Sequence, residues 1–131
     1  MCTVPQLKDL DLTDIDIVAI DLETYDPNLK TKGLGAVRKD GFVTGIAIAT
    51  SKQTLYFPIA HAMTDNLDPT TTWKYLNEKL FQNENIAKVF HNAAYDVGWL
   101  RWWGVEVKGK IIDTLIAAPL IDENRFRYSL N

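Results

Sequence analysis

Two carboxylates, Asp21 and Glu23, lie two positions apart near the end of an apolar stretch at residues 16–24. β-Branched residues crowd the first half of this stretch and nothing in it breaks the backbone, so it predicts a β-strand. Side chains alternate between the two faces of a strand, and both carboxylates therefore point the same way. Two like charges side by side repel each other unless a cation such as Mg²⁺ or Mn²⁺ binds them. The alternative is a strand that simply ends in solvent.

A third carboxylate, Asp96, lies in the run of residues 90–100. A helix is predicted at residues 93–103, with Asn92 as its N-cap and Gly104 as its stop. Asp96 falls in the first turn, where the helix dipole favours a negative charge, so helix-end electrostatics alone would also explain it. Three acids from neighbouring elements without matching cations nevertheless imply a metal site.

The elements around these acids alternate between strands and helices. The further predicted strands are residues 42–50, 54–59, 87–90 and 111–112. A helix is predicted to begin at Asp68 and Pro69, with Trp73, Leu76 and Leu80 on its buried face. Loops are expected at residues 25–41 and 61–67, and a third helix at residues 113–120. The pattern predicts an α/β layer fold with a mixed sheet covered by helices.

Cations cluster in the loop at residues 25–41, as Lys30, Lys32, Arg38 and Lys39. They would either meet phosphates or form an ordinary solvated surface. The net charge of −3 argues against a protein that grips nucleic acid mainly by a basic surface, although not against one that binds it through metals.

The length of 131 residues predicts one domain. The single cysteine, Cys2, allows no internal disulfide and no cysteine-based zinc site, which suits a reducing cytoplasm. No run approaches membrane-spanning length, and residues 1–16 lack the apolar core of a signal peptide. We therefore expect a cytoplasmic protein.

Residues 20–24 resemble the first motif, Asp-x-Glu, of the DEDD 3′–5′ exonucleases, and residues 92–96 resemble their second motif. Residues 23–27, 41–51 and 112–115 are also similar to the proofreading exonuclease domain of family A DNA polymerases, especially phage ones. The resemblance implies one domain over residues 1–131, with a lead-in at 1–15 and the second motif spanning 91–100. It also implies a ribonuclease H-like fold: a mixed five-stranded sheet flanked by helices.

The resemblance further implies two-metal phosphodiester hydrolysis at the 3′ end of single-stranded DNA, with Mg²⁺ or Mn²⁺ ions about 4 Å apart. Asp21 would bridge both ions, Glu23 would hold the water-activating ion and support the 3′ end, and Asp96 would bind the second ion. Thr24 and Asn92 would contact substrate. Asn92 would also cap the helix that carries Asp96. Tyr95 would be a core aromatic that backs the metal ligands, and the alternative is that it contacts substrate.

The family's third motif, Tyr-x-x-x-Asp or His-x-x-x-x-Asp, is not found after the second motif in these 131 residues. Tyr128 is the only tyrosine after the second motif, and its partner would fall beyond the last residue. Asp113 reads as a cap of the next helix and Asp122 as a solvated turn. His61 lacks the required spacing, and His91 has it only to Asp96, which is already the acid of the second motif. We therefore expect the C-terminal part of the domain to be incomplete in this chain.

Three functions stay open. The first is a metal-dependent 3′–5′ DNA exonuclease, or the larger part of one. The second is a non-catalytic module that binds DNA ends or a polymerase domain or subunit, whose partner would complete the fold. The third is a 3′–5′ exonuclease acting on RNA, because fold alone does not decide the substrate.

Overall fold

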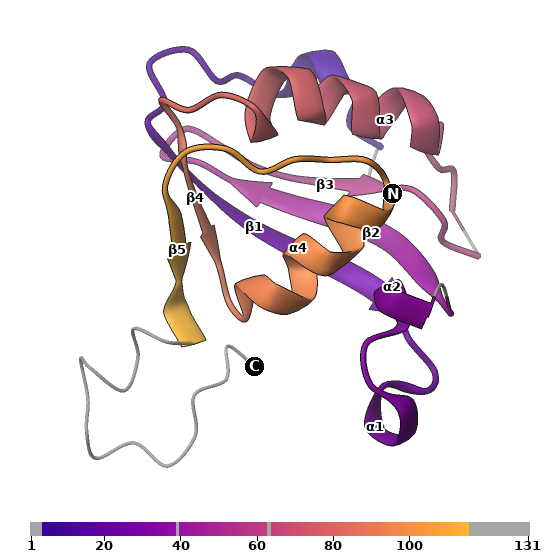
Figure 1. The fold of residues 1–131 in the computed structure, drawn as a ribbon. Coiled ribbons are helices and arrows are strands. Elements are labelled where there is room, and N and C mark those ends of the chain that lie inside the picture. The colour runs from indigo at the N-terminus through magenta and orange to yellow at the C-terminus, as the bar shows by residue number, and fades with distance from the viewer. Residues whose placement is uncertain (1–3, 39, 63, 116–131) are drawn as a thin grey trace, which may run out of the picture.

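A mixed five-stranded sheet in the order β3-β2-β1-β4-β5 forms the centre of the molecule (Figure 1). The computed structural model describes residues 4–38, 40–62 and 64–115. The strands are β1 (Ile17–Tyr25), β2 (Phe42–Ala49), β3 (Thr54–Pro58), β4 (Ala87–Phe90) and β5 (Ile111–Asp113). β1 is antiparallel to β2 and parallel to β4, while β5 continues the parallel half. The predicted sheet is confirmed.

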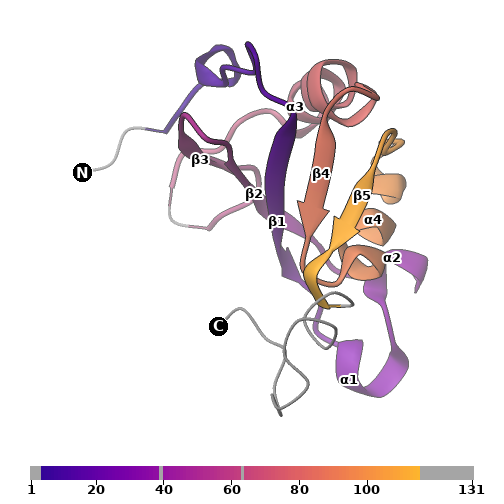
Figure 2. The same cartoon turned by 90° about the vertical axis from the view of Figure 1, so that its left-hand side faces the viewer.

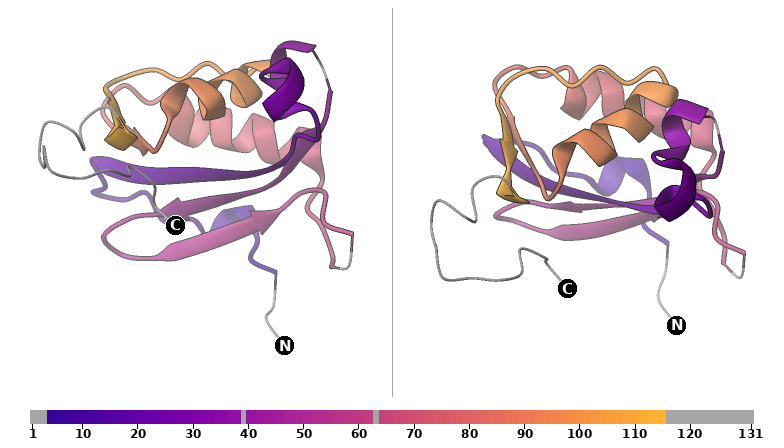
Figure 3. Two further views of the ribbon diagram at one scale, coloured as in Figure 1. Left: turned by 90° about the horizontal axis from the view of Figure 1, so that it is seen from below. Right: turned by 60° about the horizontal axis from the view of Figure 1, so that its bottom comes forward.

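The sheet has one face that helices cover and one open face, and the side chains of β1 point alternately to the two. Val18, Ile20 and Leu22 are buried, whereas Ile17, Asp21 and Glu23 alternate with them and are exposed. The main helices, α3 (Pro69–Leu76) and α4 (Ala93–Trp102), lie together over the covered face (Figure 3). The period-two pattern of β1 therefore decides which side chains enter the core and which reach the open face.

Helix α3 begins as its sequence predicts. The Asp68 carboxylate accepts a hydrogen bond from the backbone N–H of Thr71 at 2.9 Å, and Pro69 occupies the first turn. A π-helical turn over residues 77–81 continues the helix. Trp73, Leu76 and Leu80 are buried, which confirms this stripe as core.

The segment predicted as a loop at residues 25–41 contains two short helices, α1 (Leu29–Lys32) and α2 (Gly35–Arg38). Asp26 ties the start of this segment to α2, because its carboxylate accepts a hydrogen bond from the Gly35 N–H at 3.1 Å. Arg38 is 2.7 Å from the Asp40 carboxylate and also donates to the Gly33 carbonyl at 2.8 Å. The guanidinium of Arg38 is therefore engaged within the segment. Lys39 lies outside the described residues.

Residues 116–120 of the predicted third helix, with Asp122 and Tyr128, also lie outside the described residues. Within the described ranges, every helix is too short or too polar to cross a membrane.

Candidate active site

Asp21 and Glu23 lie on the open face of β1, opposite the small residues of β2. Asp21 pairs with Ala47 and Glu23 with Gly45, so the neighbouring strand leaves space around both carboxylates. A shift in register follows directly after Glu23, between it and Thr24. Such irregularities re-aim side chains at strand ends.

Asp96 reaches the same region from β4 and α4. β4 runs parallel to β1, and two residues, His91 and Asn92, separate the end of β4 from α4 (Figure 2). The first turn of α4 therefore lies at the carboxyl edge of β1. There Asp96 is 4% exposed and its carboxyl interacts with the backbone of Leu22.

Burial and neighbouring charge raise the pKa of Asp96 to about 7. Desolvation is the largest cause, and repulsion from Asp21 is the next. The backbone of Leu22 opposes the rise, and the charges of Asp113 and Glu23 add to it. Asp96 is thus a buried acid that other carboxylates surround, which is the environment that distinguishes functional acids from surface ones.

The acids fit a divalent cation. Asp96 Oδ2 is buried without a hydrogen-bond partner, and a cation would satisfy this oxygen while cancelling the repulsion from Asp21. Among the described residues, no three acidic, histidine or cysteine side chains are grouped tightly enough to hold an ion as they stand. An ion would therefore have to draw the exposed Asp21 and Glu23 side chains toward Asp96.

Helix α4 is capped by Asp113 rather than by the predicted Asn92. Asn92 occupies the N-cap position, but its backbone is left-handed, with φ of 70°, and its side chain makes no capping hydrogen bond. Instead the Asp113 carboxylate, at the end of β5, accepts the N–H groups of Asn92 and Ala93, each at 3.0 Å. The prediction that the Asn92 side chain caps this helix is wrong.

Asp113 is a structural acid that joins three elements. It also accepts the N–H of Leu115 at 3.0 Å, so it caps the start of the next segment as well as α4. Burial raises its pKa, but the N–H groups of Ala93, Asn92 and Leu115 outweigh that effect and hold the pKa below its ordinary value. Its oxygens are therefore committed to backbone donors, which makes Asp113 a poor candidate for a fourth metal-binding acid.

Thr24 and Tyr95 connect β1 to α4. Their hydroxyls are hydrogen-bonded at 2.7 Å, and the Tyr95 hydroxyl donates to Asp26 Oδ2 at 3.3 Å. This chain ties the strand that carries Asp21 to the helix that carries Asp96. The role of Asp26 was not predicted from the sequence, where its signals were its place in an Asp-Pro turn and in the family resemblance of residues 23–27.

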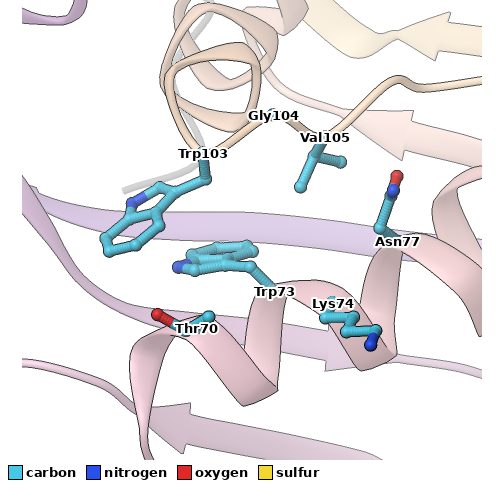
Figure 4. A pocket seen from close by; sticks show the side chains of 7 residues that line it. All are labelled: Thr70, Trp73, Lys74, Asn77, Trp103, Gly104 and Val105. Atoms are coloured by element: carbon cyan, nitrogen blue, oxygen red, sulfur yellow. The ribbon is translucent and has the colours of Figure 1, made fainter.

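A pocket of about 260 Å³ lies between α3 and the chain that follows α4 (Figure 4). Trp73 stacks on Trp103 there, with ring centroids 6.0 Å apart. None of the three predicted metal-binding acids lines it. Asp21 instead lines a smaller hollow of about 160 Å³, together with residues of β1, β2 and β4.

Comparisons with known proteins identify this arrangement. A sequence model of the family described as 3′–5′ exonuclease matches residues 6–131. A DNA-directed DNA polymerase of Pseudomonas phage M6 is 35% identical over 119 residues, which cover 86% of this chain and 18% of the polymerase. The chain therefore spans less than a fifth of that relative.

Two solved structures share the fold. Brucella melitensis NrnC with bound Mg²⁺ has a TM-score of 0.63 and 22% identity, over 92% of this chain and 52% of that chain. Trypanosoma brucei RNase D in complex with RNA U12 has a TM-score of 0.66 and 20% identity, over 86% of this chain and 36% of that chain.

The match to the family model places the chain among the DEDD exonucleases, and the mixed five-stranded sheet agrees with their ribonuclease H-like fold. Within this class, the chain belongs to the 3′–5′ exonuclease family.

Proposed function

We propose that this chain forms the metal-binding part of an exonuclease domain that removes nucleotides from the 3′ ends of DNA. The observation that carries the proposal is Asp96, a buried acid with an unpartnered oxygen and a pKa raised to about 7. Its repulsion from Asp21 is relieved only by a proton or a cation. The phage DNA polymerase relative supports DNA as the substrate and a polymerase domain or subunit as the partner.

Each acid has a separate task in this proposal. When bound, two Mg²⁺ or Mn²⁺ ions supply an activated water and stabilise the leaving 3′ oxygen. Asp21, on the central strand, acts on Asp96 more strongly than Glu23 does and would bind both ions. Glu23, two residues closer than Asp21 to the C-terminal end of β1, would bind one ion and support the 3′ end of the substrate. Asp96 would bind the other ion, from a helix that Asp113 holds in place.

The Thr24–Tyr95 hydrogen bond keeps the two acidic elements in register, because it joins them directly beside the site. Misplacement of reacting groups by about an ångström can cost on the order of a hundredfold in rate. Thr24 and Asn92 would contact the substrate from the same edge. A fourth acid with its tyrosine or histidine would be supplied from outside these 131 residues, by further chain or by a partner.

The test is a 5′-labelled single DNA strand incubated with Mn²⁺, with and without EDTA. The 131-residue chain should shorten it very slowly or not at all, and a longer chain that includes a third motif should shorten it from the 3′ end. Asp96→Ala should abolish that activity, whereas Glu78→Gln, which removes an exposed acid beyond α3, should not. Binding of DNA ends by the longer chain without shortening would favour a non-catalytic module instead.

An RNA strand of the same sequence serves as the second arm of this assay. The proposal expects DNA to be shortened faster than RNA. Faster shortening of RNA would contradict the assignment of DNA as substrate while leaving the metal site intact.

A further inference from the structure

Tyr56, on β3, lies on the same open face as the acidic pair, although nothing in the two exonuclease motifs points to it. Tyr56 pairs with Ala47, and Ala47 pairs with Asp21 on the other side of β2. Directly opposed residues in antiparallel strands share a face, so these three side chains form one row across the sheet.

Gly45 allows the Tyr56 ring to reach farther, toward Glu23. A Cβ atom built on Gly45 would lie 2.0 Å from the Tyr56 hydroxyl oxygen and 2.4 Å from its Cζ. The phenol therefore lies directly over the Gly45 backbone. Gly45 is itself the partner of Glu23. Because opposed residues have Cα atoms only about 4.5–5.5 Å apart, the hydroxyl is placed beside the Glu23 side chain.

His61 holds the Tyr56 hydroxyl in this position. Its Nε2 is hydrogen-bonded to that hydroxyl, and the two rings meet edge to face with centroids 5.5 Å apart. The loop that presents His61 is fixed in turn by Asn66, which accepts the His61 N–H at 2.8 Å and donates to its carbonyl at 2.9 Å. Tyr56 is thus held by the loop that follows β3.

The phenol keeps its proton at neutral pH. A tyrosine hydroxyl ordinarily loses its proton only at about pH 10. The hydroxyl is therefore a donor. In the His61 tautomer with its proton on Nε2, the imidazole N–H donates a hydrogen bond to the phenol oxygen. The phenol O–H can then donate a hydrogen bond to the neighbouring Glu23 carboxylate.

We propose that Tyr56 is a positioning residue of the exonuclease site, which orients the Glu23 carboxylate for metal binding through a hydrogen bond from its hydroxyl, with His61 as its support. This inference rests on the proposed function, because it assigns Tyr56 to the metal site described above. A carboxylate that a neighbour orients binds metal more tightly, and loss of such a neighbour typically lowers affinity about 10–100-fold. The ring alone cannot do this, so the hydroxyl is the part to remove.

The test measures Mn²⁺ affinity and the thermal midpoint of the 131-residue chain. Tyr56→Phe should weaken Mn²⁺ binding roughly tenfold with little change in the thermal midpoint. The matched control is Tyr75→Phe, which removes a hydroxyl from α3 on the other face of the sheet and should leave affinity unchanged. An Asp21→Ala arm tests the site itself. Unchanged affinity in Asp21→Ala would overturn the proposed function, whereas loss in Asp21→Ala with none in Tyr56→Phe would overturn only the role of Tyr56.

Two further variants separate positioning from packing. Gly45→Ala should weaken Mn²⁺ binding as much as Tyr56→Phe, because its methyl group displaces the phenol, and the double variant should be no weaker than either. His61→Ala should also weaken binding, and His61→Gln, which keeps a side-chain donor, should restore part of it. A lower thermal midpoint in Tyr56→Phe with unchanged affinity would show that the tyrosine only packs the edge of the sheet.

Discussion

Replacement of Asp96 by asparagine should make the metal-free protein less sensitive to alkaline pH. Asp96 is 4% exposed, and the pKa of its carboxyl is raised from 3.8 to about 7. Between these two values the folded state keeps a proton that the unfolded state releases. The free energy of unfolding therefore falls as pH rises through this window, and the penalty is complete above about pH 7.

The size of the effect follows from the shift. One pKa unit corresponds to 1.36 kcal/mol, so a shift from 3.8 to about 7 destabilises the folded state by about 4 kcal/mol at high pH. The asparagine of the variant would not ionise, although its buried amide would leave an unpaired N–H that costs about 1–3 kcal/mol at every pH. Only the pH-dependent part is diagnostic. The advantage of Asp96→Asn over the wild type should grow by about 3 kcal/mol between pH 5 and pH 8.5.

Urea unfolding followed by circular dichroism, in EDTA at both pH values, measures this difference. Asp65→Asn, which alters an exposed acid, is the control and should show no such change between the two pH values. Saturating Mn²⁺ should stabilise the wild type at pH 8.5 and not the variant. A variant whose advantage is the same at pH 5 and pH 8.5 would refute the view that burial and neighbouring carboxylates oppose the ionisation of Asp96.

Three further changes test other parts of the account. Asp21→Asn should leave the metal-free protein as stable as the wild type or slightly more so, because it removes the charge that most strongly opposes ionisation of Asp96. A large fall in the thermal midpoint of this variant would show that Asp21 is a structural acid. Leu76→Ala should cost about 2–5 kcal/mol in urea unfolding because the side chain is fully buried, and a cost well below 1 kcal/mol would contradict that burial. Asp113→Ala should cost about 0.5–2 kcal/mol through loss of the α4 cap, whereas Asn92→Gly should be neutral or stabilising because it relieves a left-handed backbone; equal losses would contradict the capping assignment.

Patterns that act over a few residues predicted much of this fold. The alternation in β1 correctly separated Val18 and Ile20 from Asp21 and Glu23. The Asp68 cap and the stripe that follows it also hold, because both depend on contacts within one or two helical turns. The regular spacing of apolar residues in each of these elements was enough to predict its position in the sequence.

Features that depend on distant residues were not predictable in this way. The cap on α4 comes from Asp113, which is 21 positions beyond Asn92 and meets it only because β4 and β5 pair. The helices α1 and α2 have four residues each, too few to show a period, and Asp26 with Arg38 holds them in place. Tyr56 approaches Glu23 because β1, β2 and β3 pair side by side and because Gly45, on β2, has no side chain to block the phenol.

Anomalous diffraction from a crystal soaked in Mn²⁺ tests the central claim most directly. The account predicts a Mn²⁺ peak between β1 and the first turn of α4, with oxygens of Asp21 and of Glu23 or Asp96 at about 2.0–2.5 Å. Asp21→Ala crystals under the same conditions should lack it. A clear Mn²⁺ peak elsewhere on the protein, with these three carboxylates free of metal, would contradict the account.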